Sequence, residues 1–115
     1  MSDDPCIFCR IINGEASANI LYRDERVTAL RDIHPVASTH ILVLPNRHFE
    51  SLNEMQDEGE LIGYLFMVAR QLAQKESVDQ GGYRLVINTG PDGGQTVQHL
   101  HVHLIAGRRM HWPPG

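Results

Sequence analysis

Apolar and polar positions recur with a regular period along most of the chain, and these periods predict its elements. Apolar residues at spacings of three and four, from Leu61 to Ala73, predict an amphipathic helix of about five turns. Asp57 and Glu60 have the spacing of a capping box, which places the start of this helix near Asp57. A shorter apolar face over Pro5–Ile12 predicts a second, short helix.

The other periodic segments have the composition of strands. Strands are expected at Ile20–Tyr22, Val27–Ile33, His40–Leu44, Tyr83–Asn88 and Gln98–Ala106. His40–Leu44 is apolar almost throughout, which is typical of a central strand buried on both faces. Strands outnumber helices and do not alternate with them regularly. The predicted class is therefore α+β, a mainly antiparallel five-stranded sheet with one long and one short helix. Residues 1–5 and 107–115 are expected to be tails.

Length and charge limit what such a fold can do. A chain of 115 residues predicts a single domain over residues 1–115, and a domain of this size gains stability from association. The net charge is −4, so a nucleic-acid polymer is not an expected partner. No apolar run is long enough to span a membrane, and the polar N-terminus does not resemble a signal peptide. We therefore expect a cytoplasmic protein with no membrane partner.

The two cysteines, Cys6 and Cys9, have C-x-x-C spacing. In a cytoplasmic chain this spacing favours a metal site or a redox role over a structural disulfide. Two packed thiols at helical spacing, with no ligand, are the alternative.

Three histidines, His99, His101 and His103, alternate with apolar residues in the last predicted strand. Side chains on a strand alternate between its faces, so we expect the three rings on one face, roughly 6.5–7 Å apart. Such a face can bind a metal, perform nucleophilic or acid–base chemistry on phosphate, or be merely polar and exposed. The preceding loop, 89–96, is rich in glycine, and its backbone N–H groups can converge on an anion. This loop favours phosphate chemistry, and without a cluster of acidic residues a magnesium-dependent site is not expected.

The alternating histidines resemble the signature of the histidine triad (HIT) family. The resemblance extends to Cys6–Ile12, Leu30–Pro35, Thr39–His48 and Trp112–Gly115. It implies a HIT-like fold that forms a two-fold homodimer, with the long helix and the histidine strand packed across the axis and the Trp112 tail reaching the partner's site. The length and the tail are similar to the Hint-like branch, the purine nucleoside phosphoramidases. A purine nucleotide substrate and no organic cofactor are implied.

Carried over by position, the resemblance implies a role for each histidine. His101 would be the nucleophile that attacks the α-phosphorus and forms a nucleotidyl-histidine intermediate, which water then cleaves. His103 would bind the phosphate oxygens. His99 would orient the site from behind, together with His40. A neighbouring backbone carbonyl would fix the tautomer of His101.

The resemblance also implies how the nucleotide is held. Asp32 would accept both ribose hydroxyls, since a carboxylate can accept two hydrogen bonds, and an apolar slot would enclose the base. Thr96 stands where serine is usual, so we expect a changed preference for the leaving group. Leu30 stands where an aromatic residue is common, so we expect the base slot to be less enclosed. The implied nucleotide-binding residues are Ile7, Phe8, Ile11, Asp32, Ile33, Leu42, Asn88, Gly94, Gln95, Thr96, His101 and His103. Taken singly, the apolar ones could equally be core residues.

A structural zinc site follows from the same resemblance. Bacterial relatives with this C-x-x-C use two histidines to complete a closed tetrahedral shell, which here implies the ligands Cys6, Cys9, His48 and His99. Asn88 stands where dinucleoside polyphosphate hydrolases of the Fhit type carry glutamine, which favours the Hint-like branch. A Fhit-type hydrolase and a nucleotide-binding adaptor with vestigial catalysis are the alternatives, although an adaptor needs no nucleophile.

Overall fold

The computed structural model describes residues 4–115, so residues 1–3 of the expected N-terminal tail lie outside the described part. Its helices are α1 (Ile7–Ile12) and α2 (Gly59–Lys75), and a single 3-10 turn, η1, spans Leu52–Glu54. Its strands are β1 (Ile20–Arg23), β2 (Val27–Arg31), β3 (Thr39–Pro45), β4 (Tyr83–Val86) and β5 (Val102–Ala106). The α+β class, with one long and one short helix, is confirmed.

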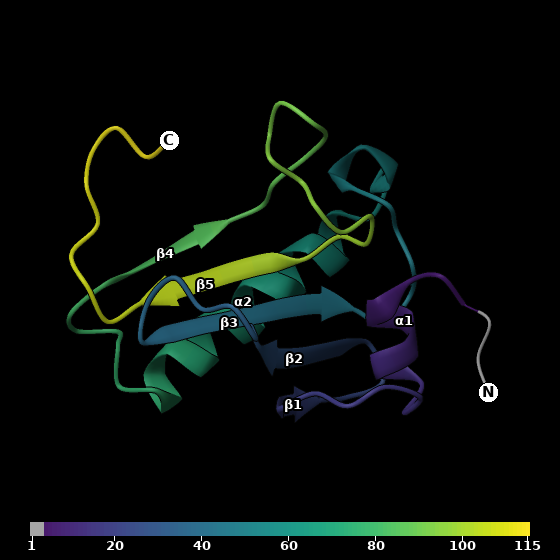
Figure 1. Cartoon of the computed structure of the whole chain (residues 1–115), viewed down its shortest axis with the longest axis horizontal. Coiled ribbons are helices and arrows are strands. Elements are labelled where there is room, and N and C mark those ends of the chain that lie inside the picture. Colours follow the sequence, from purple (N-terminus) through teal and green to yellow (C-terminus); the bar gives the residue numbers. More distant parts are fainter. Residues whose placement is uncertain (1–3) are drawn as a thin grey trace.

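The strands form one antiparallel sheet in the order β1-β2-β3-β5-β4 (Figure 1). β3 lies in the middle and is buried along its whole length, as its apolar sequence predicts. Because side chains on a strand alternate, β3 contributes to two separate cores. Ile41 and Val43 pack with α2, while Leu42 and Leu44 pack with α1.

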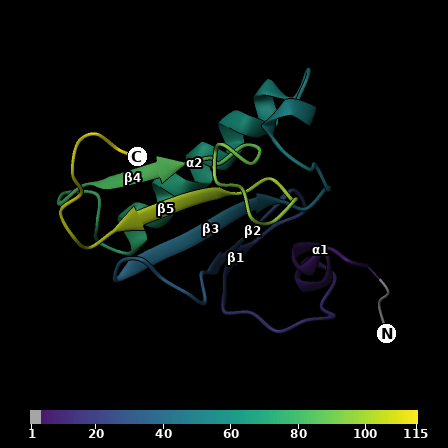
Figure 2. The same cartoon turned by 45° about the horizontal axis from the view of Figure 1, so that its top comes forward.

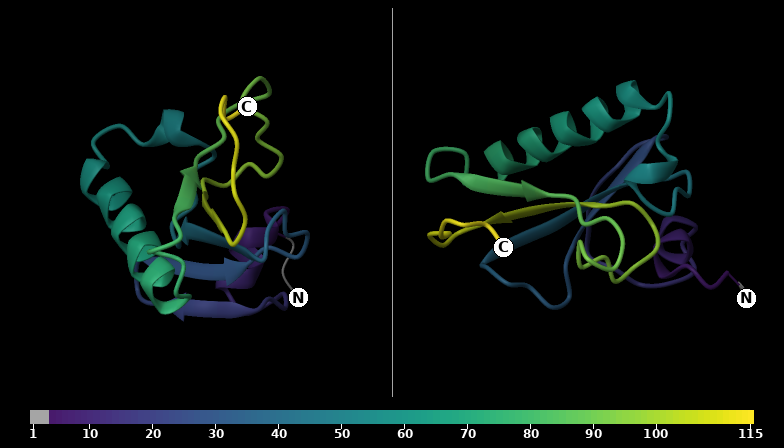
Figure 3. Two further views of the ribbon diagram at one scale, coloured as in Figure 1. Left: turned by 90° about the vertical axis from the view of Figure 1, so that its left-hand side faces the viewer. Right: turned by 90° about the horizontal axis from the view of Figure 1, so that it is seen from above.

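The two helices lie on opposite faces of the sheet (Figures 2 and 3). α2 packs along β3 and β5 and buries Leu65, Val68 and Leu72, the face that its sequence period predicts. α1 has only six residues, and it buries Phe8 and Ile11 against the other face. A helix this short covers only part of that face, which leaves room beside it for a site. None of the described helices is long and apolar enough to cross a membrane.

The start of α2 differs from the prediction. Asp57 has a left-handed φ of 62°, and Glu58 stands at the N-cap without a side-chain hydrogen bond. The predicted capping box is therefore wrong, because an N-cap residue needs an extended backbone from which its side chain can reach the first turn.

The last strand begins at Val102, four residues later than predicted. His99 and His101 therefore precede the strand, and only His103 lies on it. β2 and β4 also end earlier than predicted, so that Asp32 and Asn88 lie in loops.

Backbone hydrogen bonding explains the late start of β5. The neighbouring strand β3 ends at Pro45, which has no N–H to donate to a longer ladder. The N–H of Leu100 instead donates to the carbonyl of Phe49 at 2.7 Å. Leu100 is still only 1% exposed and packs in the α2-side core, so the alternation of side chains continues without strand pairing.

Candidate functional site

A cavity of about 340 Å³ lies on the α1 side of the sheet. Its walls are largely apolar side chains from α1, β2 and β3, and its polar groups include two triad histidines and one carboxylate. The lining residues are Ile7, Phe8, Ile11, Ser17, Ala18, Leu30, Arg31, Asp32, Ile33, His34, Leu42, Thr96, Val97, His101 and His103. This combination is typical of a small-molecule site, in which apolar walls hold the ligand and a few polar groups orient it.

Asn88, Gly94 and Gln95 are the predicted nucleotide-site residues that do not line this cavity. They shape the glycine-rich loop instead. The amide of Asn88 donates to the carbonyl of Gly93 at 2.7 Å, and the side-chain oxygen of Gln95 accepts from the N–H of Gly90 at 3.0 Å.

Sequence reasoning missed several lining residues: Ser17, Ala18, Arg31, His34 and Val97. Arg31 and His34 lie within the Leu30–Pro35 segment of the resemblance, which gives them no role, and no motif or spacing marks the other three. Arg31 ends β2, whereas loop geometry brings the other four residues to the cavity. His34 shows how: its N–H donates to Oδ1 of Asp32 at 2.8 Å, a local turn that a side-chain carboxylate commonly forms. An aspartate two residues before a histidine, ahead of a proline, is the only signal for it.

His101 presents a free nitrogen toward the cavity. Its Nδ1–H donates to the carbonyl oxygen of His99 at 2.7 Å. Because a carbonyl oxygen can only accept, the proton of the neutral ring is on Nδ1, and Nε2 keeps its lone pair. Burial lowers the pKa of His101, which favours this neutral ring. The edge of the ring also packs against Phe8, with 5.2 Å between centroids.

A chain of hydrogen bonds sets the orientation of His103. The N–H of Val36 donates to Nδ1 of His40 at 3.2 Å, so the proton of the His40 ring is on Nε2. This Nε2 atom lies 2.9 Å from Nδ1 of His103 and 3.4 Å from a carboxylate oxygen of Asp32. With Nδ1 of His103 accepting, the proton of His103 is on Nε2. Burial lowers the pKa of His40, and that of His103 to about 4, so both rings are neutral.

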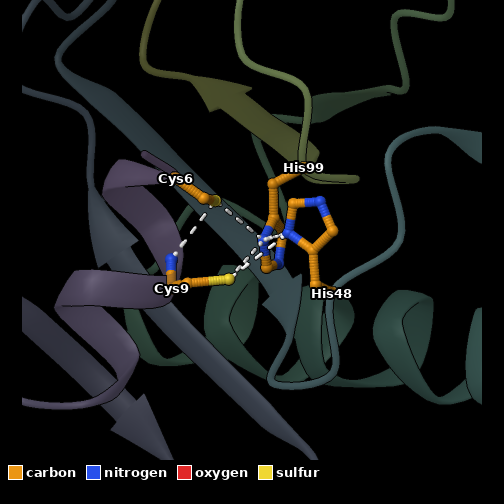
Figure 4. A group of neighbouring side chains, drawn as sticks. All are labelled: Cys6, Cys9, His48 and His99. Atoms are coloured by element: carbon orange, nitrogen blue, oxygen red, sulfur yellow. Dashed lines mark hydrogen bonds between the residues drawn. The ribbon is translucent and has the colours of Figure 1, made fainter. Parts of the chain in front are cut away.

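His40 therefore lies beside His103, whereas the side chain of His99 belongs to a second cluster. Cys6, Cys9, His48 and His99 converge there from three parts of the chain (Figure 4). Cys6 is the N-cap of α1 and Cys9 lies in its first turn, three residues further on, so the two thiols face the same way. His48 follows β3, and His99 precedes β5.

The spacing of this cluster fits a tetrahedral metal ion. Nδ1 of His99 lies 3.3 Å from Sγ of Cys6 and 3.6 Å from Sγ of Cys9. Nδ1 of His48 lies 3.3 Å from Sγ of Cys9 and 3.1 Å from Nδ1 of His99. Ligands of tetrahedral zinc, with Zn–S of about 2.3 Å and Zn–N of about 2.0–2.1 Å, are separated by about 3.6 Å (S to N) and about 3.3 Å (N to N).

Protonation at the cluster also fits a metal. Nε2–H of His99 donates to the carbonyl of Pro45 at 2.9 Å, which leaves a lone pair on Nδ1, the atom that faces the cysteines. Burial lowers the pKa of His99 to about 4. Burial, followed by the hydrogen bond and charge of Cys6, raises the pKa of the Cys9 thiol to about 12. The Cys9 thiol therefore needs a nearby cation in order to ionise, and a divalent metal bound here would supply one.

Within residues 4–115, Asp32, His40 and His103 form a second group of closely spaced potential ligands. Its hydrogen bonds do not suit a metal. The N–H of Val36 occupies Nδ1 of His40, so the His40 nitrogen that faces the group carries a proton rather than a lone pair. The two groups are thus distinguished by their outer hydrogen bonds: one is arranged as a metal site and the other as a hydrogen-bond relay.

Fold and histidine pattern together define a HIT domain protein. The HIT domain family model matches residues 13–110, most of the chain, and the chain belongs to this family. Cys6 and Cys9 lie before the matched residues.

Individual relatives extend this assignment. The chain is 46% identical over 118 residues to a 14 kDa zinc-binding protein of Zea mays, a match that covers 100% of this chain and 91% of the relative. A HIT family hydrolase from Legionella pneumophila has a similar structure, with a TM-score of 0.93 and 44% identity over 96% of this chain and 99% of that one. A zinc-bound histidine triad protein from Mycobacterium smegmatis matches with a TM-score of 0.80 and 31% identity, over 90% and 76% of the two chains.

Proposed function

We propose that this protein is a nucleotide hydrolase that cleaves the P–N bond of purine nucleoside phosphoramidates and releases a nucleoside monophosphate. The observation that carries the proposal is the geometry of His101, whose proton is held on Nδ1 by the His99 carbonyl while Nε2 is free beside the cavity. A neutral imidazole with a free, oriented nitrogen is a competent nucleophile for phosphorus. The hydrolase relative supports the general reaction class.

The cavity suits a nucleoside monophosphate unit. In the proposed complex the base lies between the apolar side chains of Phe8, Ile11 and Leu42. Asp32 accepts the ribose hydroxyls, and the α-phosphate reaches the imidazoles. Nε2–H of His103 donates to a phosphate oxygen, because the relay through His40 fixes its proton on that nitrogen. Asn88, Gly94, Gln95 and Thr96 lie on the leaving-group side.

The reaction proceeds in two displacements at phosphorus. Nε2 of His101 forms a new P–N bond while the substrate's P–N bond breaks, and the amine leaves with a proton that it takes from solvent. The ring now carries a positive charge, which the His99 carbonyl stabilises through Nδ1–H. Water then attacks phosphorus and loses a proton to solvent while the bond to Nε2 breaks, so the nucleoside monophosphate leaves and neutral His101 is restored.

We propose that Cys6, Cys9, His48 and His99 hold a structural zinc ion. A closed set of two thiolates and two imidazoles leaves no position for substrate, so the ion would join α1 to the segment before β5 without entering the chemistry. The zinc-binding relatives support this assignment. Both cysteines are free thiols, a state that a reducing cytoplasm maintains.

We also propose that the enzyme works as a two-fold homodimer. The outer edge of β4 pairs with no other described strand, and Met67 on α2 is 48% exposed. Both features suit burial against a second copy. Light scattering coupled to size exclusion tests this, and a monomer at micromolar concentration would contradict it.

The test of the function is hydrolysis of an adenosine phosphoramidate by the His101→Gly variant. We expect hydrolysis to fall by at least about 10⁴-fold, as for loss of a catalytic nucleophile, while AMP still binds. His111→Ala is the matched control, because His111 is exposed in the tail and does not line the cavity. Undiminished turnover by His101→Gly would refute the mechanism, and faster hydrolysis of a diadenosine polyphosphate by the wild type would assign the Fhit-type reaction instead.

A further inference from the structure

The two residues that follow β5 contact the loop that borders the nucleotide cavity. This loop, residues 32–38, joins β2 to β3, and Asp32, Ile33 and His34 on it line the cavity. Figure 1 shows the loop beside the start of the C-terminal tail. Between the two segments the hydroxyl of Ser38 donates to the carbonyl of Gly107 at 3.5 Å, and Nε–H of Arg108 donates to the carbonyl of Val36 at 3.0 Å.

Gly107 permits this close approach. Its φ is +96°, in a region that L side chains rarely adopt, and a Cβ atom there would lie 1.9 Å from Oγ of Ser38. Any other residue would push the loop away from the tail. The conformation at Gly107 also directs the next residue, Arg108, across the loop.

The two backbone polar groups of Val36 link Arg108 to the histidines of the proposed active site. The carbonyl of Val36 accepts from Arg108, and its N–H donates to Nδ1 of His40. The opposite side of the His40 ring faces Nδ1 of His103. The carbonyl and the N–H of Val36 belong to two successive peptide groups joined at its Cα. By holding the carbonyl, Arg108 restrains the residue whose N–H sets the tautomer of His40 and, through it, the nitrogen on which His103 carries its proton.

We propose that Arg108 is a positioning residue of the nucleotide site. It acts through its Nε–H rather than its charge, by fixing the backbone at Val36 and thereby the loop and the His40–His103 relay. This inference deepens the proposed function, since the relay matters only where His103 donates to a bound phosphate. Arg109 offers a contrast on the same segment: no described residue receives a hydrogen bond or an ion pair from its side chain.

Three variants separate the effect of the Arg108 hydrogen bond from the effect of its charge. Arg108→Gln keeps an N–H donor at the same distance along the side chain but removes the charge, and Arg108→Met removes both. Arg109→Met removes the same charge one residue further on and is the matched control. Arg108 is exposed, so we expect all three variants to fold, which equal melting temperatures would verify.

Two kinds of readout follow, NMR measurements on the free protein and AMP binding, and neither requires turnover. In Arg108→Met we expect the Val36 amide to exchange with solvent about fivefold faster, and the ring-nitrogen NMR signals of His40 to lose the single tautomer protonated on Nε2. We expect the Kd for AMP to rise about fivefold, the effect of one lost hydrogen bond. Arg108→Gln and Arg109→Met should stay within about twofold of the wild type in both measurements.

Two results would overturn the proposal: Arg108→Met leaving Val36 exchange and the His40 tautomer unchanged, or Arg108→Gln being as impaired as Arg108→Met. The second result would mean that the charge of Arg108 acts directly on an anionic ligand. If the proposed function itself fails and AMP does not bind to the wild type, the exchange and tautomer measurements still decide whether Arg108 positions the relay.

Discussion

Replacing Asp24 by asparagine is predicted to remove part of the acid sensitivity of the fold. Oδ2 of Asp24 accepts hydrogen bonds from the hydroxyls of Tyr22 and Tyr64, and Oδ1 accepts from the N–H groups of Arg26 and Val27 at 2.8 Å. Burial by itself raises the pKa of Asp24, but these four hydrogen bonds outweigh it and lower the pKa to about 2. Because Tyr64 belongs to α2, the carboxylate joins the turn between β1 and β2 to that helix.

The size of the effect follows from the displaced pKa. A fall from the usual 3.8 to about 2 corresponds to about 2 kcal/mol, at about 1.36 kcal/mol per pH unit. Asp24 is only partly buried, and solvent screening reduces this to about 1–2 kcal/mol. Since the pKa is lower in the folded state, the stabilisation is complete above about pH 5 and is lost as the pH falls toward 2. Asparagine does not ionise and leaves the two tyrosines without their charged acceptor.

Urea denaturation at pH 7, 5 and 2.5 measures the prediction. We expect Asp24→Asn to be less stable than the wild type by about 1–2 kcal/mol at pH 7, and this gap to shrink to about a third of that value at pH 2.5. Asp92→Asn is the control, because Asp92 is exposed in the loop between β4 and β5. A constant difference between Asp24→Asn and the wild type at all three pH values would refute the reasoning.

Three further outcomes are expected. Cys9→Ser should lower the zinc content from about one per chain to near zero by elemental analysis; a wild type purified without chelator that contains no zinc would contradict the site. Leu100→Ala should lower the free energy of unfolding by about 2–5 kcal/mol, since Leu100 is buried in the core, and a loss below about 1 kcal/mol would show that the segment before β5 is not anchored there. His40→Ala should lower kcat for the phosphoramidate by about tenfold or more, because Nδ1 of the half-buried His103 loses its donor; an unchanged kcat would remove the relay from the mechanism.

Local patterns predicted most of the elements, because each is determined by residues close together in the sequence. The apolar stripe of α2 and the continuous apolar run of β3 both have a direct physical reason in the faces that they bury. The strand boundaries that were predicted wrongly depend on residues that are distant in the sequence. β5 could not be delimited from its own alternation, because its start depends on Pro45 ending the neighbouring strand and on Phe49 accepting the N–H of Leu100.

The candidate site likewise combines features that the local sequence predicts with features that long-range contacts decide. The alternation of His99, His101 and His103 with apolar residues indicated that the rings share a side of the chain, but it assigned them no separate surroundings. In the structure His99 faces the cysteines and His48, while His103 pairs with His40. Neither arrangement could follow from spacing, because the partners come from segments at least 39 residues away, as in the contact between Cys9 and His48.

The sequence by itself therefore determined the α+β class, the identity of the imidazoles and thiols, and the glycines that let the chain turn, because these depend on local periods and side-chain chemistry. Only the tertiary structure decided which nitrogen of each ring carries the proton. A tautomer is set by the group on the opposite nitrogen: the carbonyl of His99 for His101, the carbonyl of Pro45 for His99 and the N–H of Val36 for His40. Whether a histidine can attack, bind a metal or donate a hydrogen bond depends on these backbone contacts, which exist only once the chain has folded.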